Sequence, residues 1–206
     1  PIVIFSAIWP FFKSLNSSKN ETLDLILESF MISAKNRLVM MPSFTKGFIN
    51  GVCNLDKAKS LNGLFSERFR EKYSTVRSRS AFFSFSACGE YAEQILSLKP
   101  KNAWGKNSIY EWMELCNARM SMLGTHSTHC SYLHRIEWFN KERIIYRENK
   151  TFKGYLKINN ELIESQETLF VRKSNPEAIN DFSHLKKYLT EASSDAFLNC
   201  AAFLLK

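Results

Sequence analysis

The chain has 206 residues, a formal net charge of +8 at pH 7 and a hydrophobic share of 45%. It contains only 7 glycines and 5 prolines, and 17 phenylalanines, 7 tyrosines and 4 tryptophans supply large apolar side chains. This composition excludes a disordered chain and predicts one domain, residues 1–206, with a buried core. The positive charge favours anionic partners in general and selects none of them.

The five cysteines are odd in number and scattered, which argues against a disulfide framework and favours reduced thiols. They are Cys53, Cys88, Cys116, Cys130 and Cys200.

Residues 1–12, PIVIFSAIWPFF, are the most apolar stretch, and the first charge is Lys13. Crossing a bilayer needs roughly 20 such residues, so this stretch is too short to span a membrane. No positive region precedes it, as a cleaved signal peptide would require. We expect an edge strand; the alternatives are that residues 1–20 form an export segment covered by a secretion chaperone, or an organelle-targeting segment.

The first half of the chain predicts a mixture of helices and short strands. Asn20 is the expected cap of a helix over residues 21–34. A capping box at Ser108 and Glu111 predicts a helix that continues to Met122 and is closed by Gly124. The remaining elements are strands at 37–41, 48–53 and 74–85, short helical pieces at 57–62 and 66–72, and a helix at 89–98.

Strands dominate the second half, with a final helix from Ser174 to about Leu189. The strands are expected at 130–139, 143–148, 152–158, 168–172 and 196–205, with Asn140 and Asn159-Asn160 as turn signals. Helices come early, strands come late, and there is no βαβ alternation. The sequence therefore predicts an α+β fold with mostly antiparallel sheets and an N-terminal helical part.

The segment GTHSTHCSYLH contains four side chains that zinc accepts as ligands: His126, His129, Cys130 and His134. On the expected strand, His129 and His134 point to opposite faces and cannot converge on one ion. We therefore predict no metal site, and interpret these residues as ordinary polar positions of a strand.

Cys88 begins the segment CGEYA, where a thiol at a helix N-terminus would have a lowered pKa and act as a nucleophile. The segment is similar to the nucleophile region of papain-like and transglutaminase-like cysteine hydrolases. His129 or His134 would then be the base, with Asn149 or Glu148 as its orienting group. A protease or deamidase that uses Cys88 is thus an alternative function, and a buried structural cysteine is the plain one.

A basic run over residues 68–79 could contact nucleic acid, since backbone binding uses clustered cations. It consists of Arg68, Arg70, Lys72, Arg77 and Arg79. No recognition motif or second basic cluster accompanies it. A solvated face or a grip on an anionic cofactor explains the run equally, so we predict no nucleic-acid partner.

A further set of residues suits the transfer of ADP-ribose from NAD. Arg77, or Arg79 on the same expected strand face, would hold a phosphate or ribose through a forked contact. Ser127 and Thr128 would shape the nicotinamide pocket. A late carboxylate would stabilise the positive charge that develops as nicotinamide leaves.

The chain also resembles the EspJ/HopF family of type III secreted effectors, which have the ADP-ribosyltransferase fold. The resemblance rests on the arginine strand, on THST followed by LHRIEW, and on the closing stretch from Asn180-Asp181-Phe182 to Glu191-Ala192-Ser193-Ser194. It implies that Arg77 binds NAD and that Asp181, or else Glu191, is the catalytic acid. Glu161, Glu164 and Glu167 do not provide the Glu-x-Glu pair of many ADP-ribosyltransferases.

The resemblance implies a monomeric, NAD-dependent transferase that contributes to virulence. The bacterium would secrete it into the host cell cytoplasm, where it would modify a signalling protein, with tyrosine kinases as the leading class of target.

Overall fold

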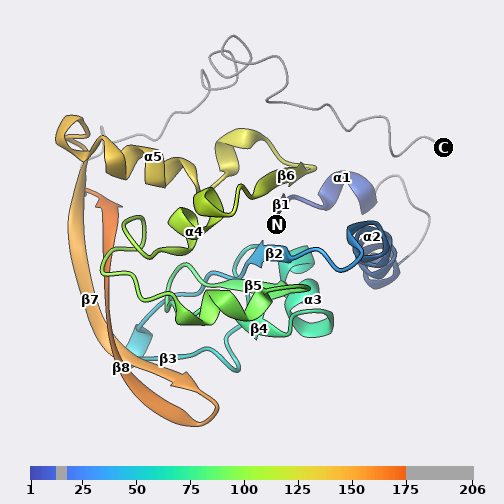
Figure 1. Ribbon diagram of the computed structural model, residues 1–206, viewed down its shortest axis with the longest axis horizontal. Helices are drawn as coiled ribbons and strands as arrows, with labels where there is room; N and C mark the ends of the chain where they lie inside the picture. Colours follow the sequence, from blue (N-terminus) through green and yellow to red (C-terminus); the bar gives the residue numbers. More distant parts are fainter. Residues whose placement is uncertain (13–17, 175–206) are drawn as a thin grey trace.

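The computed structural model describes residues 1–12 and 18–174, which form two sheets with helices around them (Figure 1). The larger sheet has five strands in the order β4-β5-β2-β1-β6. Strand β1 lies between two parallel neighbours, β2 and β6, while β5 pairs antiparallel with both β2 and β4. The strands are β1 Ile2–Ser6, β2 Val39–Pro42, β4 Val76–Arg77, β5 Phe85–Cys88 and β6 Arg119–Leu123.

The smaller sheet is built on a long hairpin that runs along one side of the molecule (Figure 1). Strand β7, Arg147–Ile158, pairs antiparallel with β8, Glu161–Arg172, over its whole length. The turn residues Asn159 and Asn160 both have positive φ, as a two-residue hairpin turn of matching twist requires. The short strand β3, Val52–Asn54, joins β7 in parallel.

Five helices and four short 3-10 turns complete the described part of the chain. The helices are α1 Trp9–Phe12, α2 Lys19–Ala34, α3 Leu64–Lys72, α4 Ile109–Leu115 and α5 Leu133–Phe139. The 3-10 turns are η1 Ile49–Gly51, η2 Ala92–Ser97, η3 Ser127–His129 and η4 Lys141–Arg143. None of the helices in residues 1–12 and 18–174 is long and apolar enough to cross a membrane.

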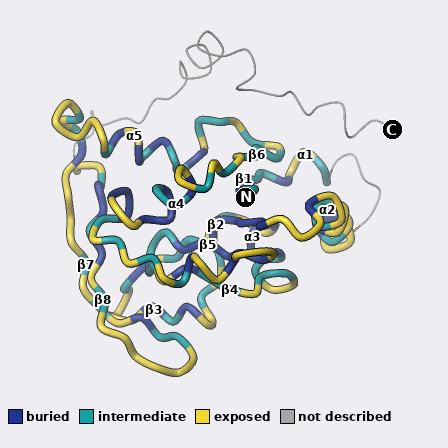
Figure 2. Tube along the Cα trace, in the orientation of Figure 1, coloured by how far each residue is buried: buried dark blue, intermediate teal, exposed yellow. Residues whose placement is uncertain are grey.

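The five-stranded sheet separates two apolar clusters, because side chains alternate between its faces. Val3 and Phe5 of β1 point into the cluster that contains Trp104 and Tyr110, and Ile4 points into the cluster beneath α2 and α3. Figure 2 shows this buried centre and the exposed outer surfaces of α2 and of the β7–β8 hairpin. Since both faces of β1 are covered, its first four residues, Ile2 to Phe5, are all apolar.

Several predictions are confirmed. Helix α2 matches the helix expected over residues 21–34, although its cap is Ser18, which forms a capping box with Glu21. Helix α3 matches the piece expected at 66–72, and Asn159-Asn160 forms the expected turn. The fold is α+β, as predicted.

Other predictions are wrong. Strand β1 is an inner strand, not an edge strand, and three of the six strand pairings are parallel, so the sheets are mixed rather than mostly antiparallel. The helix expected from residue 108 to 122 ends at Leu115, because Asn117 takes a left-handed conformation with φ 50°, and β6 follows it.

The largest error concerns residues 130–139, which form α5 and its approach rather than a strand. Most of the strand expected at 74–85 is loop, and only residues 92–97 of the helix expected at 89–98 form a turn, of 3-10 type. The strand expected at 152–158 is part of the longer strand β7, which begins at Arg147, so only the last two residues of the strand expected at 143–148 belong to a strand. The final helix and strand, at 174–189 and 196–205, lie outside the described residues beyond position 174.

Candidate functional site

The site is centred on His134 and Glu137, which lie one turn apart on α5. At this i, i+3 spacing two helical side chains are neighbours. Nδ1 of His134 lies 2.5 Å from Oε2 of Glu137. The Glu137 side chain is 6% exposed and that of His134 is 25% exposed. A buried carboxylate thus holds a histidine ring that solvent can reach.

The Glu137 carboxylate is also held by the start of β7. The hydroxyl of Tyr146 donates to Oε1 at 2.6 Å, and Nε of Arg147 donates at 3.2 Å to the same oxygen. Arg147 is itself buried and donates to the carbonyl of Phe170 at 2.9 Å. Burial alone would raise the pKa of Glu137, but the hydrogen bonds from His134 and Tyr146 and the charge of Arg147 hold it below its usual range. Glu137 is therefore ionised at neutral pH.

The ionised state of Glu137 fixes the proton on the imidazole. A carboxylate without a proton can only accept, so the short contact places a proton on Nδ1 of His134. Nη2 of Arg147 lies 3.1 Å from the same nitrogen, but it cannot donate to a nitrogen that already carries a proton. In the neutral ring the lone pair is then on Nε2, which makes Nε2 the basic atom.

Packing fixes the position of the histidine ring. Trp104, which is 2% exposed, meets it edge to face with ring centroids 5.4 Å apart. On another side of α5, Arg135 forms a bidentate pair with Glu114, each contact 2.6 Å long, and donates to the carbonyl of Trp104 at 2.5 Å. The helix is therefore anchored through Arg135 as well as through Glu137.

The approach to α5 passes the end of β1. Gly124 has φ 66°, and a Cβ at this position would lie 2.3 Å from the carbonyl oxygen of Ala7, so only glycine allows the two segments to approach so closely. The N–H of Ala7 donates to the carbonyl of Leu123 at 2.9 Å. Ser131, nearer to α5, accepts a hydrogen bond from the buried Tyr110 at 2.9 Å.

A hollow lies at the end of β1, against the N-terminus of α3. It is lined by Ser6, Ala7, Ile8, Trp9, Asn62, Gly63, Leu64 and Phe65. No side chain caps α3, because its N-cap residue is Gly63. The buried hydroxyl of Ser6 has no hydrogen-bond partner. Uncapped helix N–H groups beside an unsatisfied hydroxyl suit a phosphate group.

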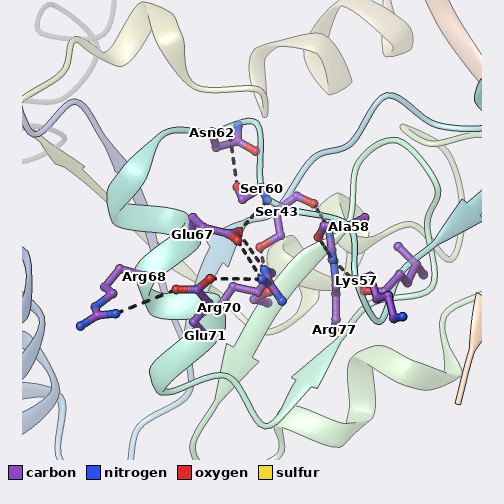
Figure 3. Close-up of polar contacts among 12 residues, drawn as sticks. Ser43, Lys57, Ala58, Ser60, Asn62, Glu67, Arg68, Arg70, Glu71 and Arg77 are labelled. Atoms are coloured by element: carbon purple, nitrogen blue, oxygen red, sulfur yellow. Dashed lines mark hydrogen bonds and ion pairs between the residues drawn. The ribbon is translucent and has the colours of Figure 1, made fainter. Parts of the chain in front are cut away.

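Arg77, the predicted arginine of the site, is a structural residue in the fold. Its guanidinium donates to the carbonyls of Ser43 and Ala58, each at 2.6 Å (Figure 3). It also donates to the carbonyl of Leu55 (2.9 Å) and to the hydroxyl of Ser84 (3.1 Å). Burial, followed by repulsion from Arg70, lowers the pKa of Arg77 to about 10. The N–H groups of the Arg77 guanidinium therefore connect the loops that contain Ser43, Leu55 and Ala58 to strand β4.

The structure does not bring the other predicted site residues together around Arg77. Arg79 lies in an exposed loop on the rim of a second hollow, and Ser127 and Thr128 form η3 between β6 and α5. The hydroxyl of Thr128 contacts Nδ1 of His126 at 3.0 Å. The two candidate acids, Asp181 and Glu191, lie outside the described residues.

Cys88 does not begin a helix, so the cysteine-hydrolase interpretation is wrong. It ends the buried strand β5, and burial raises the pKa of its thiol to about 11. A neutral, buried thiol is a poor nucleophile. Within residues 1–12 and 18–174, no group of three or more His, Cys, Asp and Glu residues is placed to hold a metal ion.

The basic run over residues 68–79 does not form one stripe. Arg68 pairs with Asp24 and Arg70 with Glu67 on and around α3, and Arg77 is turned inward. Lys72 also contacts Asp24, at 2.9 Å. Three of these cations are therefore balanced by carboxylates.

Sequence reasoning missed Glu137, Tyr146 and Arg147 as site residues. The available signal was the spacing of His134 and Glu137 within LHRIEW, which joins the two side chains only on a helix. Interpreted as a strand, the same segment places them on opposite faces. The incorrect secondary structure therefore concealed the pair.

Several solved structures with a similar fold are acetyltransferases. The structure of AAC-IIIb in a binary complex with CoASH has a TM-score of 0.72 and 16% identity, over 92% of this chain and 76% of that one. The aminoglycoside acetyltransferase AAC(3)-Xa has a TM-score of 0.74 and 12% identity, over 93% and 75%. A histidine-to-alanine mutant of AAC(3)-IVa in complex with apramycin has a TM-score of 0.62 and 17% identity, over 93% and 72%.

At these identities the likeness establishes the fold, which is that of an aminoglycoside acetyltransferase. The sequence profile of the aminoglycoside 3-N-acetyltransferases matches residues 33–199, which is most of the chain. The chain belongs to this family. No curated protein sequence matches it.

The family overturns the resemblance to the EspJ/HopF effectors. The ADP-ribosyltransferase fold and activity are wrong, as is NAD: the family consists of N-acetyltransferases, and one structural neighbour carries CoA. The NAD-binding roles given to Arg77, Arg79, Ser127 and Thr128 are withdrawn with that cofactor. A host signalling protein or kinase as target, a secretion chaperone, and secretion into a host cell as a virulence effector were implied only by the effector interpretation, and they are wrong with it.

Proposed function

We propose that the protein is a single acetyltransferase domain that moves an acetyl group from acetyl-CoA to an amine of an amino-sugar compound. The observation that carries the proposal is the His134–Glu137 pair, a solvent-accessible imidazole held by a buried, ionised carboxylate. The protein's membership of the 3-N-acetyltransferase family supports the reaction class. Relatives solved with CoA and with an aminoglycoside support the two classes of substrate.

The amine must lose a proton as its nitrogen bonds to the acetyl carbon and the carbon–sulfur bond breaks. Nε2 of His134 takes this proton and can return it to the departing sulfur. The resulting imidazolium is stabilised by Glu137, as the carboxylate of a catalytic triad stabilises its histidine. Tyr146 and Arg147 keep that carboxylate ionised and oriented.

Acetyl-CoA supplies an activated acetyl group, and the hollow at the end of β1 has features that fit its phosphates. The N–H groups of the first turn of α3 and the hydroxyl of Ser6 would hold a phosphate there. Trp9, which is 62% exposed on the wall of the same hollow, offers a flat surface for a purine base.

The test is acetyl transfer to an amino sugar or an aminoglycoside, followed by mass spectrometry of the acceptor, with CoA binding measured separately by calorimetry. Wild type should form the acetylated amine. His134→Ala should lose turnover by at least about a hundredfold, the usual contribution of a general base, while still binding CoA.

His126→Ala is the matched control, since this exposed histidine lies outside α5. The proposal fails if the wild type transfers no acetyl group to any amine, or if His134→Ala turns over as fast as the control.

A further inference from the structure

Exposed cations gather beside the His134–Glu137 pair. Arg172 lies directly across the hairpin from Arg147, and the N–H of Lys173 donates to the carbonyl of Tyr146 at 2.9 Å. Arg143 closes η4, three residues before Tyr146. We call Arg143, Arg172 and Lys173 the basic rim; all three are exposed.

Among the described residues, the basic rim has few carboxylates around it. Within the residues that the structure describes, no ion pair joins Arg143, Arg172 or Lys173 to an acidic side chain. Over residues 141–150 and 172–173, the exposed cations number five and the carboxylates two. The cations are Lys141, Arg143, Lys150, Arg172 and Lys173, and the carboxylates are Glu142 and Glu148.

Buried and half-buried carboxylates around α5 are already engaged inside the protein. Glu137 is bound by His134 and Arg147. Glu114 forms the bidentate pair with Arg135, and Glu111 accepts the N–H of Asn107 at 2.6 Å. Among residues 1–12 and 18–174, an acceptor with several ammonium groups would find few free carboxylates near α5 and would meet the basic rim instead.

We propose that the acceptor amine belongs to an anionic molecule, an amino sugar joined to a phosphate or a nucleoside diphosphate, whose phosphate binds the basic rim. This inference rests on the proposed acetyl transfer. Arginine fits a phosphate through two parallel hydrogen bonds, and lysine adds a point charge. Binding the phosphate at the start of β7 would place the attached amine near His134, while a polycationic aminoglycoside would be repelled.

The first test compares acceptors that differ in charge: UDP-glucosamine and glucosamine, which share the same 2-amine, and the polycationic sisomicin. At low salt kcat/KM should fall in that order, with UDP-glucosamine at least about tenfold above sisomicin, the lower end of electrostatic steering. Added salt should narrow the difference, since exposed charges are screened. A preference for sisomicin, or a difference in kcat/KM between UDP-glucosamine and sisomicin that added salt does not reduce, would overturn the proposal.

The second test asks whether the basic rim binds the phosphate of the acceptor or a phosphate of acetyl-CoA. The double variant Arg172→Gln/Lys173→Gln should raise the KM for UDP-glucosamine about tenfold and leave the KM for acetyl-CoA unchanged. The matched control is Lys57→Gln/Lys59→Gln, which removes the same charge from exposed positions next to β3.

A rise in the KM for acetyl-CoA instead would assign the rim to CoA and refute the proposal. Equal kinetics of the two double variants would also refute it. If wild type acetylates none of the three acceptors while binding CoA, it is the acetyl-transfer function itself that fails.

Discussion

Replacing Glu137 by Gln tests the central contact of the site. The change keeps the shape of the side chain and an oxygen that can accept from His134, but removes the negative charge. At an effective dielectric constant of about 20, two unit charges roughly 4 Å apart attract by about 4 kcal/mol. Because about 1.36 kcal/mol corresponds to a tenfold change in rate, kcat should fall about a thousandfold if Glu137 stabilises a protonated His134.

The same substitution has a pH-dependent effect on stability. The pKa of Glu137 is lower in the folded protein than in the unfolded chain, so ionisation of this group favours folding above the unfolded pKa of about 4.3, and that contribution is lost as the pH falls through the folded pKa. Glu137→Gln should therefore lower the free energy of unfolding at neutral pH by up to about 3 kcal/mol, since it removes the charge of the buried carboxylate that Arg147 contacts. The difference in the free energy of unfolding between wild type and Glu137→Gln should become smaller at acidic pH.

The assays are single-turnover acetyl transfer and urea unfolding between acid and neutral pH. Glu142→Gln is the control, because it makes the same chemical change on a side chain that is 88% exposed. A variant at Glu137 that keeps more than about a tenth of wild-type kcat would refute the electrostatic role. A stability deficit that does not vary with pH would refute the assigned ionisation.

Three further results are expected. Arg77→Met should lower the free energy of unfolding by about 3 kcal/mol, because it leaves buried carbonyls without a donor, and urea titration should show a much smaller loss for the exposed Arg79→Met. Iodoacetamide at neutral pH should modify the partly exposed Cys116 before Cys88, whose buried thiol has a pKa raised to about 11; peptide mass spectrometry that finds Cys88 modified first would contradict this. Burial raises the pKa of Glu167, so its ionisation opposes folding as the pH rises through that pKa. Glu167→Gln should increase the thermal midpoint at mildly alkaline pH and lose this advantage in acid, as calorimetry can show.

Some local signals in the sequence predicted local structure. The hairpin turn carries Asn159-Asn160, and helix α2 was expected from its own residues, although its cap is Ser18 and not the expected Asn20. The parallel pairing of β1 with β2 and β6 could not be predicted in this way, since it joins residues that are far apart in the chain. An apolar segment such as residues 2–6 shows that a strand is buried, but not which strands will flank it.

The site was harder to predict for the same reason. Arg77 looked like a ligand-binding residue because its carbonyl partners lie 19 to 34 positions away and leave no pattern in the sequence. His134 was considered as a base, yet the residues STHCSYLH favoured a strand, and on a strand its contact with Glu137 does not exist. Only the helix joins the two side chains.

The buried charged residues of α5 indicate that the helix is held in place for function more than for stability. In seven residues it buries both Arg135 and Glu137, and each needs an oppositely charged partner from another element. Burying such pairs costs desolvation energy that apolar side chains of similar size would avoid, so the pairs are weak contributors to net stability. What they provide is orientation: Arg135 fixes one side of the helix to Glu114 and Trp104, and Arg147 fixes the other side through Glu137. His134 lies on the helix that these two attachments hold, and a base must be held still to meet an amine.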